Sequence, residues 1–462
     1  MLLCVNCDSF VDLSDDLGFD LEVSVDIHET VDLLLDIGHL CIAEAAGIGK
    51  LLYGGDDAVK ALDKILFRVH LFTVTPTGVA AGKSNAAEFA DENGLALIFV
   101  TVGKGSHMQI TTAEIDHLEA LYADRKVFHG ELHDHADTGG TSDGGRTLAH
   151  WKAVMEALKM DFAAILDHRQ VRHMYLPEWE DGLFLCGTEP SAHILDSKAE
   201  HGQVHYNMLF DSPKPLEELL EEFPEYQFTG GQEGHFQYPA FTTERFCQLI
   251  DSVKAKGGLF VHPHPKQLMK SEDPADYWFR DWTGLEVFYR DYRDLRPGKE
   301  YTTANYELWT SLLAMGKRIW CCAGGDGHKV CSDKALTTLY AEERTNVSMM
   351  KPLRVGDFTC GAVGVRMCIG DTVCGGACEI DGKRLLVSVS DFHESVYIKG
   401  HTYRVDVLNA EGLVCSKELS YEDCKKPQYL AVDTVNSDFY RVEVVDVTSS
   451  VRIALGNPIW NG

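Results

Sequence analysis

Residue types that bind metal ions follow a series of short apolar segments in the middle of this 462-residue chain. His133 and His135 stand two residues apart, directly after the segment 127-VFHGEL-132. On a strand this spacing puts both imidazole rings on one face. Later apolar segments lead into the same kinds of residue, namely Asp167, His168, Glu189, His205, 262-HPHP-265, Asp326 and His328. Imidazole and carboxylate together suit zinc, manganese or iron, and the absence of Cys at these positions argues against a closed structural zinc site.

These residues need a scaffold that brings distant segments together. Residues 126–348 alternate short apolar runs with helical patterns, which is typical of a parallel sheet built from βαβ units. Helices are predicted over 146–160, 242–258 and 306–318, and strands over 127–132, 162–166, 183–187, 204–209, 259–263, 284–289 and 319–324. Seven strands indicate a barrel, and in barrels the active site lies where the strands end. The candidate ligands would therefore converge on one rim.

The flanking regions have a different pattern of predicted strands and helices. Residues 1–125 are predicted to form a β-rich α+β domain, with strands at 21–27, 66–74 and 95–102 and a helix over 112–124. Residues 349–462 contain alternating strands separated by Gly and Asp turns, which favours an antiparallel β-sandwich. No chemical motif is identified in residues 1–125.

The ordered motifs between 127 and 330 resemble the PHP family, named for polymerase and histidinol phosphatase. This resemblance implies a distorted (β/α)7 barrel that holds two to three divalent metal ions (Zn, Mn or Fe). It implies one ion on His133, His135, Glu189 and Asp326, a second on Glu189, His205 and His264, and a third on Asp143, His168 and His328. More narrowly, the flanking domains and 457-NPIW-460 are similar to the carbaryl-hydrolase-like branch of these metallohydrolases.

Two ligand positions keep an alternative. The loop from His135 to Asp143 is longer than the family's usual spacing, so Asp137 could replace Asp143. In 262-HPHP-265 two histidines compete, and His264 is favoured over His262 because the family's His-Pro follows a strand and one small residue.

Roles follow from these positions. Glu189, Asp326 and His328 are the predicted catalytic residues, and Glu189 can bridge two ions because a carboxylate has two oxygens. Arg169, His173 and Lys329 are the predicted substrate-binding residues, because a cation beside the metals could bind a phosphoryl oxygen. Asp134 and Asp167, next to ligands, are candidates for fixing the imidazole tautomers.

The acidic composition limits the kinds of partner that the protein is expected to bind. The chain has 42 basic and 71 acidic residues, a net charge of −29, which predicts no nucleic-acid partner and no membrane partner. The N-terminus lacks the pattern of a secretory signal, so a cytoplasmic location is expected. The expected partner is a small-molecule substrate, a phosphate ester, and oligomerisation stays open.

Three functions compete. The first is metal-dependent hydrolysis of a small phosphomonoester or phosphodiester by activated water. The second is a PHP-type hydrolase of a carboxylic ester, carbamate or amide. The third is a non-catalytic binding scaffold, which the complete set of nine ligand positions disfavours.

Overall fold

A computed structural model describes residues 86–90, 96–100, 110–196, 203–226, 239–265, 278–294 and 300–462. The chain forms two units, Met1–Ser106 and His107–Gly462. In the first unit, strands β1 (Ala86–Ala90) and β2 (Ala96–Val100) pair antiparallel. The strand predicted over 95–102 corresponds to β2, whereas those predicted over 21–27 and 66–74 lie outside the described residues.

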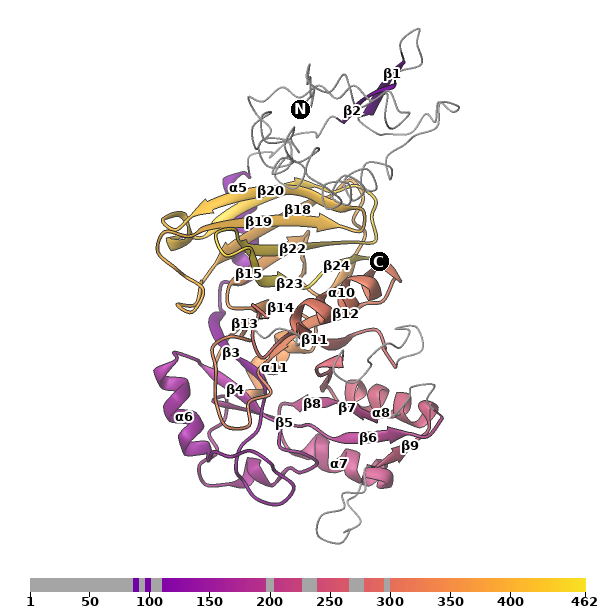
Figure 1. The fold of residues 1–462 in the computed structure, drawn as a ribbon, viewed down its shortest axis with the longest axis vertical. Coiled ribbons are helices and arrows are strands. Elements are labelled where there is room, and N and C mark those ends of the chain that lie inside the picture. The colour runs from indigo at the N-terminus through magenta and orange to yellow at the C-terminus, as the bar shows by residue number, and fades with distance from the viewer. Residues whose placement is uncertain are drawn as a thin grey trace, which may run out of the picture. The chain divides into compact units, whose positions relative to one another are not determined.

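Seven strands of the second unit are hydrogen-bonded to one another in the order β12-β11-β10-β8-β5-β4-β3. Figure 1 labels β12, β11, β8, β5, β4 and β3 of this series. They are β3 (Lys126–Asp134), β4 (Phe162–Ile165), β5 (Phe184–Thr188), β8 (Asn207–Phe210), β10 (Leu259–His262), β11 (Thr283–Tyr289) and β12 (Ile319–Gly324). Neighbours pair in parallel except that β8 runs antiparallel to β5 and β10. A parallel bridge between Asp134 and Gly327 links the end of β3 to the segment after β12. The ends of the first and last strands of the series therefore meet.

The strand predicted over 204–209 is divided in the structure. β7 (Gln203–His205) pairs with β6 (Ser191–Ile194), which also pairs with β9 (Ala240–Phe241), while β8 belongs to the seven-strand series. The change of sheet at Tyr206 explains the difference, because an apolar alternation does not show which neighbour each half of a strand pairs with.

Two of the helices between these strands begin directly after a threonine. α6 (Leu148–Ala157) and α8 (Thr243–Ala255) follow Thr147 and Thr242, whose side chains accept hydrogen bonds from backbone N–H groups of the first turn. α7 (Lys214–Glu222), α10 (Tyr301–Ala314) and α11 (Asn346–Leu353) complete the set. The second unit thus has a mixed α/β architecture, and the helices predicted over 146–160, 242–258 and 306–318 correspond to α6, α8 and α10.

The C-terminal strands build two sheets. Through β13 (Thr337–Ala341) and β14 (Phe358–Gly361) the large sheet continues from β3 to β23 (Val451–Gly456), β22 (Phe439–Asp446), β19 (Thr402–Asn409) and β20 (Gly412–Ser420). A second sheet has the order β16-β15-β18-β21, from β15 (Gly364–Ile369), β16 (Thr372–Val373), β18 (Arg384–Ser390) and β21 (Gln428–Asp433). β24 (Ile459–Asn461) pairs with β22 and, in parallel, with β17 (Ala377–Cys378). One core contains apolar side chains of both sheets, including Val387, Val405 and Val442. The large sheet contains strands from both sides of the domain limit that the sequence placed between residues 348 and 349. The domain limits therefore stay predictions.

Helix α5 (Thr112–Ala120) joins this C-terminal part. Its Glu119 forms a bidentate ion pair with Arg366 of β15, at 2.7 and 2.8 Å, and Leu118 is buried in a small core with Leu386 of β18. The sequence predicted this helix as the end of the N-terminal region. Its apolar face is instead covered by the C-terminal strands.

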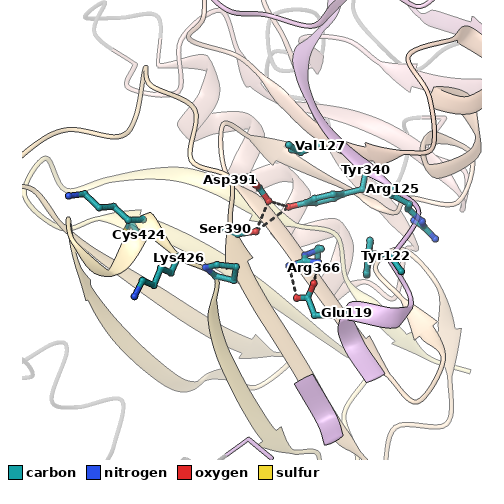
Figure 2. Close-up of a pocket in the computed structure, with 13 residues that line it drawn as sticks. Glu119, Tyr122, Arg125, Val127, Tyr340, Arg366, Ser390, Asp391, Cys424 and Lys426 are labelled. Atoms are coloured by element: carbon teal, nitrogen blue, oxygen red, sulfur yellow. Dashed lines mark hydrogen bonds and ion pairs between the residues drawn. The ribbon is translucent and has the colours of Figure 1, made fainter. Parts of the chain in front are cut away.

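A cavity of 350 Å³ lies beside α5 and the start of β3 (Figure 2). Its polar groups largely satisfy one another: Arg366 pairs with Glu119, and Tyr340 donates a 2.7 Å hydrogen bond to Asp391. Val127 lines this cavity, whereas His133 and His135 follow near the other end of β3. The cavity is thus separate from the candidate ligands.

One histidine of β3 makes folding sensitive to pH. Burial, and then the neighbouring His393 imidazole, lower the pKa of His129 from 6.5 to about 4. The unfolded chain takes up this proton near pH 6.5 but the folded chain only near pH 4, so stability is present above pH 6.5 and lost as the pH falls towards 4. Between pH 7 and 5 we expect the free energy of unfolding to fall by about 2 kcal/mol more in the wild type than in His129→Gln. Urea denaturation of both proteins at the two pH values measures this difference, and parallel curves would contradict it.

Candidate metal centre

The first group of convergent ligand atoms forms where β3 ends. His133 and His135 are fully buried, and the Nε2 atom of each lies 3.1 Å from Oε2 of Glu189. Oδ1 of Asp326, beyond β12, lies 3.4 Å from His135 Nε2 and 3.8 Å from His133 Nε2. Two imidazoles and two carboxylates thus face one point, a donor set that suits a divalent cation.

Glu189 also belongs to a second group. Its other oxygen, Oε1, lies 3.1 Å from Nδ1 of His205, at the end of β7, and 3.2 Å from Nε2 of His264, beyond β10. Glu189 follows β5 directly, and its side chain is only 1% exposed. One buried carboxylate therefore joins two groups, each through a different oxygen.

The third group is more open to solvent. Oδ2 of Asp143 lies 3.2 Å from Nε2 of His328 and 3.5 Å from Nε2 of His168, and His135 completes the set. Asp143 is 54% exposed, in contrast to the buried Glu189. The long loop therefore does carry Asp143 to His168 and His328, while Asp137 is exposed and belongs to none of the three groups.

Hydrogen bonds fix the tautomers of three histidines. Nδ1 of His133 lies 3.0 Å from Oε1 of Glu286, and Nδ1 of His168 and of His328 lie 2.8 and 3.0 Å from the backbone oxygens of Glu189 and Asp326. A carboxylate or carbonyl oxygen only accepts, so each Nδ1 donates its proton, and Nε2 is the ring nitrogen left to ligate a cation when one is bound. Glu286, an acid within the apolar strand β11, was missed in the sequence.

The two acids proposed for this role have other tasks. Asp134 accepts a 3.1 Å hydrogen bond from Gly327 N, across the bridge that links β3 to the segment after β12. Asp167 accepts a 2.8 Å hydrogen bond from Ala136 N and a further one from the Thr138 hydroxyl. Both carboxylates are buried, and Asp167 anchors the start of the loop that leads to Asp143.

This anchoring makes a prediction. Replacing Asp167 with alanine frees the loop that carries Asp143, so we expect the third group to bind a divalent cation roughly 10- to 100-fold more weakly. The second group keeps its geometry because none of its members lies in or next to this loop. Metal titration followed by elemental analysis measures the change, with Asp137→Asn as the control from the same loop. Unchanged binding in Asp167→Ala would show that the loop needs no such anchor.

The shifted pKa values of His133 and Glu189 also reflect how closely these side chains approach one another. Burial alone would lower the pKa of His133, but the carboxylates of Glu189 and Glu286 raise it well above its usual value. Burial would raise the pKa of Glu189, but the imidazoles of His133 and His205 hold it well below its usual value. His135 Nδ1 and His264 Nδ1 are buried without a hydrogen-bond partner. A buried carboxylate that stays ionised needs positive charge close to it, and divalent cations bound by these carboxylates and histidines would supply that charge.

The structure separates some predicted residues from the three groups. His262 packs against the rings of Phe260 and Phe279, and burial lowers its pKa to about 3. His173 is fully buried with Nε2 3.1 Å from the Gly187 oxygen, so its ring is turned into the core. Among the predicted substrate-binding residues, Arg169 directly follows His168 and is half-buried, and Lys329 directly follows His328 and is exposed.

Four of the nine described non-glycine residues with a positive φ lie in or next to the three groups. Arg169, His264, Arg290 and Asp326 all have positive φ angles, of 52°, 30°, 66° and 48°. Such conformations cost about 1–3 kcal/mol each for residues other than glycine and are retained where surrounding structure enforces them, often at functional sites. Sequence patterns did not reveal them because none of the four is a glycine.

Comparisons with known proteins give weak matches. A scan against protein-family models and a search of curated proteins found no match. Among solved structures, the chain is similar to the lesion-specific endonuclease PfuEndoQ from Pyrococcus furiosus, with 12% identity, a TM-score of 0.31 and coverage of 50% of this chain and 57% of that chain. It is also similar to endonuclease Q in complex with a 27-mer duplex that has an abasic lesion at the active site, with 10% identity, a TM-score of 0.29 and coverage of 50% and 58%. The chain therefore matches less than two thirds of the length of either protein.

These structures correct one prediction. The net charge predicted no nucleic-acid partner, whereas one of the similar structures is an endonuclease in complex with a 27-mer duplex substrate, so this prediction is withdrawn. The physical reason is that net charge sums the whole surface, whereas a phosphodiester meets the local field, which bound cations would make positive. Within the described residues, no helix has the length and apolar character needed to cross a bilayer.

Proposed function

We propose that this protein is a metal-dependent phosphoesterase of the PHP type, which hydrolyses a phosphate monoester or diester. The observation that carries the proposal is the linkage of the three ligand groups, because Glu189 belongs to two of them and His135 to two. Shared ligands would hold cations close together, an arrangement typical of sites that act on phosphate esters. In this proposal the seven strands form the distorted (β/α)7 barrel of residues 126–348, followed by a C-terminal β-sandwich.

The chain's own residues would divide the work as follows. His133, His135, Glu189 and Asp326 would hold the first ion, Glu189, His205 and His264 the second, and Asp143, His168 and His328 the third, with His135 beside it. When bound, such ions lower the pKa of water and neutralise charge on a phosphoryl group. Burial of the first two groups keeps bulk water away from Glu189, while Asp143 and His328 stand at the open side where a substrate can enter.

Zinc, manganese and iron all suit this donor set. Protein purified without chelators is therefore expected to contain one or more of these metals. The test compares the metal-loaded protein on p-nitrophenyl phosphate, bis-p-nitrophenyl phosphate, p-nitrophenyl acetate and a short DNA duplex with an abasic site. Cleavage of a phosphate ester that depends on added metal supports the proposal. Cleavage of the acetate alone would replace it with a carboxylic ester hydrolase, and no cleavage in any metal would leave a binding scaffold.

A further inference from the structure

Arg290 lies beside the first ligand group, immediately after β11. Its Nη2 atom donates a 2.7 Å hydrogen bond to Oδ2 of Asp326, whose Oδ1 faces His135 and His133. The Arg290 side chain is 42% exposed, so the guanidinium reaches from a buried ligand carboxylate to solvent. A permanent positive charge therefore stands one carboxylate away from the place proposed for the first ion.

The neighbouring Tyr289 makes a similar bond from a buried position. Its hydroxyl donates a 2.6 Å hydrogen bond to the same Oδ2 atom of Asp326. The guanidinium of Arg290 lies 4.8 Å from the centre of the Tyr289 ring, and this cation–π contact helps to orient the guanidinium. Because Tyr289 already satisfies this oxygen, the position of Asp326 does not require the charge of Arg290.

The chemistry of the guanidinium indicates what else it can bind. Arginine carries five N–H donors in a planar fork that matches two phosphoryl oxygens, and the bond to Asp326 is made by Nη2. The next arginine along the chain, Arg293, has both Nε and Nη2 engaged by Asp291. The positive φ of 66° at Arg290 shows that the turn after β11 adopts an unfavourable backbone conformation at this residue.

We propose that Arg290 is a substrate-binding residue that contacts a non-bridging phosphoryl oxygen, and that Tyr289 is the positioning residue for Asp326. The inference rests on the phosphoesterase function proposed above. It adds a binding residue that sequence adjacency did not indicate, since Arg290 follows a strand that ends without a metal ligand.

The test compares Arg290 with Tyr289, because both side chains donate a hydrogen bond to Oδ2 of Asp326. Arg290→Met removes the charge, Arg290→Lys keeps the charge without the fork, and Tyr289→Phe removes the other bond to Asp326 Oδ2. Arg293→Met removes a nearby charge as a control. For each metal-loaded protein, calorimetry measures the binding of inorganic phosphate, elemental analysis measures metal content, and kinetics on p-nitrophenyl phosphate separate KM from kcat.

We expect Arg290→Met to bind inorganic phosphate roughly 10- to 100-fold more weakly, because bonds to a charged partner of this kind contribute that much affinity. KM should rise by a similar factor while metal content stays at the wild-type level, and Arg290→Lys should fall between the two. Arg293→Met should bind phosphate like the wild type, whereas any loss of phosphate binding in Tyr289→Phe should follow a loss of metal, because Tyr289 acts through Asp326.

The proposal is overturned if Arg290→Met binds phosphate normally, if the wild type binds none, or if Arg290→Met and Tyr289→Phe lose metal and phosphate together. The last result would mean that Arg290 acts only through Asp326. Phosphate binding that depends on Arg290 in a protein that cleaves no phosphate ester would uphold this site and reject the proposed hydrolysis, so the two failures are distinguishable.

Discussion

Glu189→Gln is expected to lower the rate of phosphate-ester hydrolysis by roughly a thousandfold, which corresponds to about 4 kcal/mol of lost transition-state stabilisation. Glu189 contacts His133 and His135 through Oε2 and His205 and His264 through Oε1. Glutamine keeps one oxygen but replaces the other with an N–H donor, which cannot ligate a cation. Two ligand groups therefore lose charge through one substitution.

Metal analysis and steady-state kinetics measure this effect together. Glu189→Gln should contain less metal than the wild type after identical dialysis, whereas Asp137→Asn, which removes an exposed acid outside the three groups, should keep both metal and activity. If Glu189→Gln retains full metal content and full activity, Glu189 does not join the two groups functionally.

Removal of metal ions is expected to abolish hydrolysis and to lower thermal stability. Ligands that bind only the folded state stabilise it by an amount that grows with the logarithm of their concentration, about 2.7 kcal/mol at one hundred times the dissociation constant. Without cations, the buried carboxylate of Glu189 has only the surrounding imidazoles to balance its charge. A chelator should thus lower the midpoint of thermal unfolding, and added Zn²⁺, Mn²⁺ or Fe²⁺ should restore it.

Differential scanning calorimetry with and without chelator checks this prediction. Glu189→Gln serves as the reference, because its unfolding midpoint should respond less to chelator and to added metal than that of the wild type. A wild-type midpoint and activity that are both insensitive to prolonged chelation would contradict a metal site in these three groups.

Much of the seven-strand series could be predicted from the sequence. Each strand is a short apolar run between turn residues, and these local patterns correspond closely to β3, β4, β5, β10, β11 and β12. The ends of such runs are also visible locally, which is why His133, His135, His168, Glu189 and Asp326 could be selected as candidate ligands. The helix over 112–124 was visible too, but its partners were not, because the apolar face of α5 is complementary to strands that lie more than two hundred residues away.

Local sequence pattern could not decide which of His262 and His264 is the candidate ligand. Two residues apart on one strand, both rings would lie on the same face. β10 ends at His262, and His264 adopts a φ of 30°, which turns its ring towards Glu189 while His262 stays among aromatic side chains. The resemblance to a family favoured His264, but strand alternation by itself could not.

By itself, the sequence determined which residues could bind metal ions and the order in which strands would present them, because both depend on residue type and on short-range hydrophobic pattern. Tertiary structure alone decided that Glu286 orients His133, that Asp167 anchors the loop of Asp143, and that Tyr289 and Arg290 bind Asp326. It also decided that His173 points into the core. These contacts join residues of different strands and loops, and the direction of a side chain across such distances is set by packing and by backbone strain at strand ends, neither of which has a local signature.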